Sequence, residues 1–219
     1  AAAGQLRSAF EALDGGPQLA AFRASLLLGL GRVDAAEALL DAQNADASVL
    51  AVRTMIQVAR NDDAALATAR SAVGNDPQSA TAQLALSYAL QGARQLAAAQ
   101  AAARHATELA PDHPIAWARR AELELALAQV DAGEESARRA LALAPDTPRA
   151  QAMAAFALLL KGQIDAAAAA FDKALAGNGT DPLAHFGRGL THVRRGELAA
   201  GRRDIEIAAL LHPSHAESR

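Results

Sequence analysis

Residues 77–111 read PQSATAQLALSYALQGARQLAAAQAAARHATELAP, two runs of helix-forming residues bounded by two prolines. The turn Arg94-Gln95-Leu96 separates the two runs. Because proline has no amide hydrogen and cannot continue a helix, the two prolines delimit the unit. The stretch therefore predicts a pair of helices, at 78–92 and 95–110.

The same boundary recurs along the chain with a period of 34 residues. Pro145 follows Pro111 after 34 residues, and Pro213 lies two further periods along. The place between Pro145 and Pro213 holds Gly179, and glycine also ends helices. This spacing predicts one pair of helices in each period.

A second series, of short turns, runs in phase with the first. The turns fall at Gly31, Arg60, Arg94, Ala128, Gly162 and Gly196. The first interval is 29 residues and the others are 34, so we expect the second repeat to be five residues short. A helix–turn–helix unit repeated at this period is typical of an α-solenoid.

Small side chains occupy three recurring places in these units. The first place holds Ala24, Ser87, Ala121, Ala155 and Gly189; the second holds Ala36, Ala65, Ala99, Gly133, Ala167 and Gly201; the third holds Ala72, Ala106, Ala140, Ala174 and Ala208. Larger side chains there would push the two helices of a pair apart.

This pattern resembles the tetratricopeptide repeat (TPR) family over residues 17–213, with Trp117, Phe171 and Ile205 at the family's bulky places. Four arginines depart from it: Arg53 at a small-residue place, and Arg23, Arg120 and Arg188 where the family prefers leucine.

The resemblance implies an all-α fold, a right-handed α-solenoid of antiparallel helix pairs with about six TPR units. Residues 1–16 would form an orphan helix, the second half of a preceding repeat, and 214–219 a truncated tail.

We expect thirteen helices from these boundaries. They are predicted at 5–14, 17–30, 33–43, 46–60, 63–74, 78–92, 95–110, 113–128, 131–144, 147–161, 164–176, 181–195 and 197–211.

Composition argues against several classes of function. The net charge is −3 and aromatic residues make up 3% of the chain, so neither charge nor stacking favours binding of nucleic acid. The absence of cysteine rules out disulfides and thiolate metal sites. No apolar run reaches the ~18 residues that a membrane span needs, so we expect no direct membrane insertion.

No arrangement of residues indicates an enzyme, a metal site or a cofactor. His185 and His192 lie two turns apart on one predicted helix, with no acid placed as a third ligand, so we expect ordinary surface or groove histidines.

Arginine pairs occur at Arg119-Arg120, Arg138-Arg139, Arg194-Arg195 and Arg202-Arg203. We expect them on a solvated surface with ion pairs inside each helix. Docking of an acidic partner segment on the last repeat is the alternative.

In TPR proteins the first helix of each repeat lines a concave face, so the resemblance implies a binding groove there. The residues that it places in the groove are Leu84, Tyr88, Ile115, Glu122, Leu125, Phe156, Leu159, Leu183, Phe186, Leu190 and Val193. Gln91 and Arg149 also fall at such places, but the lysines, arginines and asparagines with which some members hold a C-terminal carboxylate are not matched. We expect a protein-interaction scaffold that binds an apolar or amphipathic partner segment. The alternative is that these side chains belong to the core.

The last predicted helix carries Ile205, Ile207, Leu210 and Leu211, and the sequence shows no helix that would cap them. We expect either that the chain is cut from a longer protein or that this face pairs with another chain. Self-assembly through this helix or the groove is therefore the second functional hypothesis.

A looser resemblance concerns the compartment. Ala116-Trp117-Ala118-Arg119 and the stretch at 196–208 are similar to TPR segments of exported bacterial envelope proteins. This resemblance favours the bacterial periplasm over the cytoplasm.

Overall fold

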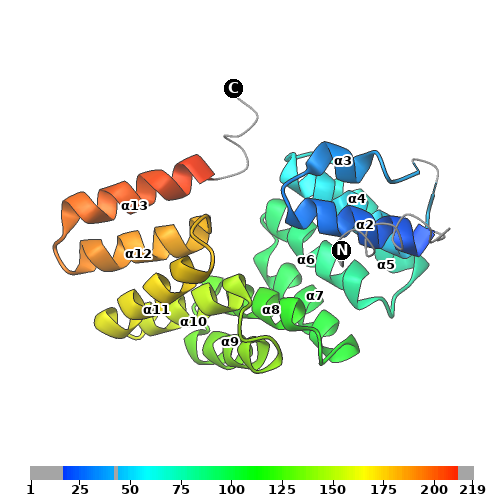
Figure 1. Cartoon of the computed structure of the whole chain (residues 1–219). Helices are drawn as coiled ribbons and strands as arrows, with labels where there is room; N and C mark the ends of the chain where they lie inside the picture. The colour runs from blue at the N-terminus through cyan, green and yellow to red at the C-terminus, as the bar shows by residue number, and fades with distance from the viewer. Residues whose placement is uncertain (1–16, 42–43, 212–219) are drawn as a thin grey trace, which may run out of the picture.

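The computed structural model describes residues 17–41 and 44–211 of the chain, and within these ranges it holds twelve α-helices and no β-strand. The helix expected at 5–14 and the tail at 214–219 lie outside the described residues. The helices follow one another as antiparallel pairs that form an arch (Figure 1). The expected all-α solenoid is confirmed.

Each pair consists of an inner first helix and an outer second helix. The pairs are α2 (Pro17–Gly29) with α3 (Val33–Glu37), α4 (Ala47–Ala59) with α5 (Ala65–Asn75), α6 (Ala80–Gly92) with α7 (Leu96–Leu109), α8 (Pro114–Ala126) with α9 (Val130–Leu143), α10 (Pro148–Leu160) with α11 (Ile164–Gly177), and α12 (Pro182–Arg194) with α13 (Leu198–Leu211). The main contacts of each helix lie within its own pair or with a neighbouring pair. The α2–α5 region and α13 therefore stand at opposite ends of the arch (Figure 1).

Local sequence explains where the first helices begin. Proline occupies the first turn of α8, α10 and α12, where a missing amide hydrogen costs nothing. The side chains of Asp46, Ser79 and Asp181 accept hydrogen bonds from main-chain amides at the starts of α4, α6 and α12. Such caps satisfy amides that have no partner within the helix.

The first pair departs from the expected boundaries: α3 ends at Glu37, so the helix predicted to reach residue 43 is wrong for 38–41, and 42–43 lie outside the described residues. The missing residues therefore belong to the first pair, and the expectation of a shortened second repeat is corrected. Arg53 of α4, at a place where the family has a small residue, donates from Nη2 to the carbonyl oxygen of Asp41 at 2.7 Å. The shortened second helix leaves room for this long side chain.

All the small residues predicted at the helix crossings are buried. Glycine is required at several of them: a Cβ on Gly133 would lie 2.6 Å from Leu125 Cγ, and one on Gly201 would lie 2.9 Å from the carbonyl oxygen of Gly189. The core is thus a thin layer in which alanine and glycine allow close contact between backbones, with Phe171 among its largest fully buried side chains.

The turns between paired helices contain a residue with left-handed φ. Glycine fills this place at Gly31, Gly162 and Gly196, but Ala128 adopts φ 58°. A left-handed conformation costs an L-residue with a Cβ roughly 1–2 kcal/mol.

We expect Ala128→Gly to raise the free energy of unfolding by about 1 kcal/mol, measured by urea denaturation. The control Ala101→Gly, in the exposed interior of α7, should lower it by about 1 kcal/mol. A loss of stability in both variants would contradict the strain at Ala128.

Candidate binding groove

A groove with a volume of about 730 Å³ lies on the inner side of the arch. It is lined by Val58, Ala59 and Asn61 at the end of α4, Tyr88 and Gln91 from α6, Glu122 from α8, Arg149 from α10, Pro182, Leu183 and Phe186 from α12, and Ile205, Ala208 and Ala209 from α13. The lining thus starts near one end of the described solenoid and finishes at the other.

The lining is apolar at both ends and polar between them. The α4 end presents Val58 and Ala59, whereas α12 and α13 present Leu183, Phe186 and Ile205. Phe186 is 41% exposed, although phenylalanine is usually buried. The groove can therefore accept apolar side chains on either side of a polar centre.

The polar centre rests on a fully buried arginine. Arg119 of α8 has no exposed surface, and its guanidinium donates from Nε to Ser87 Oγ at 3.0 Å, from Nη2 to Ser87 O at 2.9 Å and from Nη1 to Gln91 Oε1 at 2.7 Å. The guanidinium also lies over the Tyr88 ring, 3.9 Å from its centroid. These contacts tie α8 to α6 and hold Tyr88 and Gln91 in place.

Glu122 joins two arginines across the centre of the groove. Its Oε1 lies 3.1 Å from Nη1 of Arg119, and its Oε2 accepts from Nη1 of Arg149 at 2.7 Å. Burial by itself lowers the pKa of Arg149, but its interactions with Tyr88 and Glu122 outweigh that effect and raise it. The guanidinium of Arg149 therefore keeps its charge inside the groove.

The structure corrects several predictions of groove residues. Leu125 is 9% exposed and Leu159 is 7% exposed, so both belong mainly to the core. They pack against residues of the paired outer helices α9 and α11, in agreement with the alternative that these side chains belong to the core. Phe156 is half-buried, with its ring edge-on to that of Phe171 at 4.9 Å between centroids.

Of the predicted groove residues, four line the groove: Tyr88, Glu122, Leu183 and Phe186. Leu84, Ile115, Leu190 and Val193 are at least partly exposed but lie outside its lining. Gln91 and Arg149 already stood at concave places of the repeat, so the register was the signal for them. Val58, Ala208 and Ala209 carried no such signal, because their approach to the groove depends on the curvature of the whole arch.

The four residues predicted for an oligomerisation face also lie in different surroundings. Ile205 lines the groove, and its part in an oligomerisation face stays a prediction. Ile207 is 38% and Leu210 is 69% exposed on the other side of α13, and Leu211 is half-buried.

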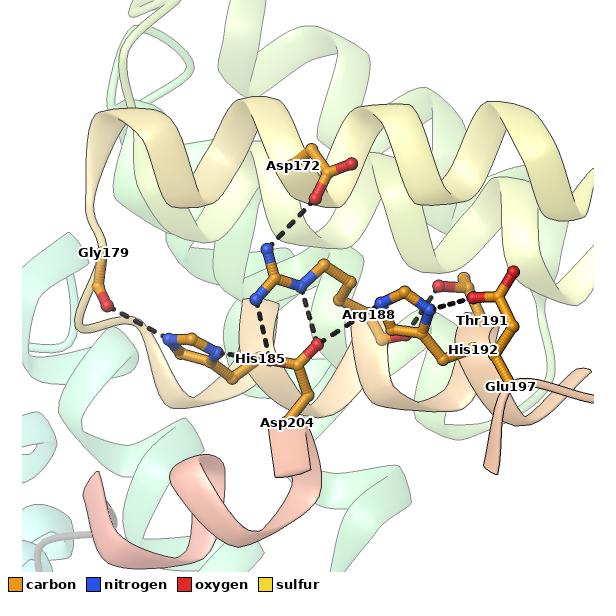
Figure 2. Close-up of polar contacts among 8 residues, drawn as sticks. All are labelled: Asp172, Gly179, His185, Arg188, Thr191, His192, Glu197 and Asp204. Carbon is orange, nitrogen blue, oxygen red and sulfur yellow. Dashed lines mark hydrogen bonds and ion pairs between the residues drawn. The ribbon is translucent and has the colours of Figure 1, made fainter. Parts of the chain in front are cut away.

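A network of charged side chains holds α13 against α12 (Figure 2). The buried carboxylate of Asp204 accepts two hydrogen bonds from Arg188, from Nε and from Nη2, both at 2.7 Å. His185 lies 3.0 Å from the same carboxylate through Nδ1, and 3.1 Å from the carbonyl oxygen of Gly179 through Nε2. Arg188 also donates to Asp172 of α11, so three helices meet at this point.

This network positions one wall of the groove, because Ile205 and Ala208 lie next to Asp204 on α13. Burial alone raises the pKa of Asp204, but hydrogen bonds from Arg188 and His185 outweigh it and hold the pKa below its ordinary value. The hydrogen bond to Asp204 likewise raises the pKa of Arg188, so the pair stays ionised.

Two expectations about charged residues need correction. His185 is buried and bound between α13 and the loop before α12, and is not an ordinary surface histidine. Arg119 and Arg188 bind residues of neighbouring helices 16 or more positions away, and the pattern of arginines along the sequence cannot show such partners. For the arginine pairs, ion pairs inside each helix were expected, and Arg119, Arg120, Arg138 and Arg202 do pair with Glu122, Glu124, Glu135 and Glu206. The expected solvated surface is wrong for Arg119, which is fully buried.

Two kinds of feature are absent from the described ranges, 17–41 and 44–211. No group of three or more histidine, cysteine, aspartate or glutamate side chains is placed there to hold a metal ion. None of the helices in these ranges combines the length and the apolar content that crossing a bilayer requires.

Comparison with solved structures places the fold among TPR solenoids. The crystal structure of TTC0263, a thermophilic TPR protein of Thermus thermophilus, is similar with a TM-score of 0.64 and 24% identity, covering 84% of this chain and 99% of that one. MamA from Desulfovibrio magneticus RS-1 is similar with a TM-score of 0.57 and 17% identity, covering 81% and 100%. The Cut9–Hcn1 hetero-tetramer of the APC/C matches with a TM-score of 0.70 and 18% identity, covering 94% of this chain and 42% of that one.

The chain therefore has the TPR fold that its repeats predicted. No protein-family model and no curated protein matches the sequence. At these identities the likeness concerns the fold alone, and the function must be argued from the groove.

Proposed function

We propose that the protein is a non-catalytic scaffold that binds a segment of a partner protein in the groove. The observation that supports this proposal is the exposure of Phe186 and its apolar neighbours in a concave surface of about 730 Å³. Solenoids use such concave surfaces for binding, and a groove with apolar anchors suits an amphipathic segment. A periplasmic location remains a proposal that rests on the resemblance of the sequence.

Peptides selected from a random display library on the whole chain test this proposal. We expect them to bind Phe186→Glu at least ~10-fold more weakly than the original protein, because the new carboxylate would have to lose its water against the peptide's apolar side chains. The matched control is Leu143→Glu, an exposed leucine on the outer helix α9. Circular dichroism checks that both variants fold. Equal binding by the original protein and Phe186→Glu would overturn the assignment of the groove.

Self-assembly through α13 is the second candidate function. It is favoured by the exposure of Leu210, at 69%, and of Leu198, at 66%, on the last described helix. The two candidates differ in the state of the isolated protein, so the same preparations are examined by light scattering across a concentration series. A monomer at all concentrations supports the scaffold, whereas a mass that rises with concentration and falls in Leu210→Glu supports self-assembly.

A further inference from the structure

Arg149 brings unused hydrogen-bond donors into the groove. Its side chain is 39% exposed, and its one hydrogen bond within the described residues runs from Nη1 to Glu122 at 2.7 Å. A guanidinium carries five N–H donors and no acceptor. Most of the donors of Arg149 are therefore available to an acceptor that enters the groove.

Two carboxylates and a second guanidinium lie near Arg149. Glu122 is shared between Arg119 and Arg149, so one carboxylate faces two guanidinium groups. Asp181 also acts on Arg149 electrostatically, but its Oδ1 accepts from the main-chain amides of Leu183 and Ala184 and thus caps α12. Both acids thus bind other donors as well, and Arg149 keeps donors that neither of them has taken up.

Apolar residues lie on both sides of Arg149 along the lining, next to it on α12 and beyond Tyr88, Gln91 and Glu122 on α4. Leu183 and Phe186 follow it along the solenoid, and Val58 and Ala59 lie at the other end of the lining. A small free anion would leave both apolar regions exposed to water. An acid carried between apolar side chains would cover them and reach the guanidinium together.

We propose that the groove recognises an internal acidic residue, aspartate or glutamate, set between apolar residues of a partner's amphipathic segment, and that Arg149 is the group that binds its carboxylate. The inference rests on the proposed function and names the chemistry of its partner. A chain-terminal carboxylate fits less well, because a segment that ends at Arg149 would cover the apolar surface on one side only. A charge-assisted hydrogen bond to a guanidinium is among the stronger single contacts available to such a segment.

The selected peptides provide the test. We expect peptides selected on the original protein to be enriched in an Asp or Glu flanked by apolar residues. Replacing that residue in a synthetic peptide by Asn or Gln should weaken binding about 10-fold or more in calorimetric titration. On Arg149→Gln the same replacement should change binding by less than about twofold, because the charged partner is gone. The control is Arg104→Gln, an exposed arginine on the outer helix α7, on which the full 10-fold effect should remain.

The outcomes separate the two proposals. Two results would overturn the role of Arg149 and leave the groove standing. In the first, the selected peptides lose binding to Phe186→Glu but show no acidic preference. In the second, the acid-to-amide replacement weakens binding as much on Arg149→Gln as on the original protein. Peptides that bind Phe186→Glu unchanged, or a library that yields no binder, would overturn the groove and this inference with it. Peptides whose carboxylate is the chain terminus would also overturn the internal-acid proposal.

Discussion

Replacing Arg119 by alanine is expected to lower the free energy of unfolding by about 3–5 kcal/mol, the usual cost of removing one partner from a buried charged network. The side chain has no exposed surface and joins Ser87, Gln91 and Glu122 through a single guanidinium. Its loss would leave the Ser87 carbonyl without that donor, open a cavity between α6 and α8 and remove the cation above Tyr88. Urea denaturation followed by circular dichroism measures the change.

Two further variants test whether the loss of stability comes from the hydrogen bonds of the buried Arg119 guanidinium. Arg119→Lys should recover little of the lost stability, because an ammonium cannot reproduce a planar fork of donors that reaches three acceptors. Arg138→Ala is the matched control: Arg138 is exposed and, among the described residues, pairs with its helical neighbour Glu135, so the urea midpoint of the variant should equal that of the original protein. An Arg119→Ala variant that unfolds at the midpoint of Arg138→Ala would show that the buried network contributes nothing.

Gly187→Ala should be the most damaging single-methyl change in the described solenoid, with a loss of about 3 kcal/mol or more. A Cβ at this position would lie 2.1 Å from Cζ and 2.2 Å from Cε1 of Phe171, well inside van der Waals contact. Phe171 has no exposed surface and its ring packs edge-on against Phe156, so a shift of the ring would disturb its neighbours. The helices α11 and α12 would have to separate.

Gly74→Ala is the matched control, since it adds the same methyl group in a helix at a place with no atom within 4 Å. Helix propensity alone should make this variant more stable, by about 0.5–1 kcal/mol. A double variant with Phe171→Leu tests the mechanism, because the smaller side chain should restore part of the stability that Gly187→Ala removes. If Gly187→Ala and Gly74→Ala shift the urea midpoint alike, the steric explanation fails.

The helices were predictable because their ends depend on local chemistry. Proline, glycine and the capping residues act within one turn, so the helix expected at 95–110 is α7 at Leu96–Leu109, and that expected at 164–176 is α11 at Ile164–Gly177. The exception is α3, where five residues are missing and the helix ends at Glu37. A period can show that residues are absent, but it does not show which turn of which helix is lost.

The groove was predictable in part. The repeat register placed Tyr88, Glu122, Leu183 and Phe186 on the concave side, and these four residues line the groove. It failed for Leu125 and Leu159, because the place that they occupy faces the paired helix and is buried by it. A position in a repeat indicates the face of a helix, but burial depends on how closely the neighbouring helix approaches.

The sequence by itself determined the class of this protein: an all-α solenoid of paired helices with small residues at each crossing, since every such feature depends on one helix and its nearest neighbour. Only the tertiary structure decided which residues share the groove. Val58 of α4 and Ile205 of α13 line one surface because small rotations between successive pairs add up along the arch. The same geometry buries Arg119 and leaves Arg149 with free donors, although both are arginines on inner helices.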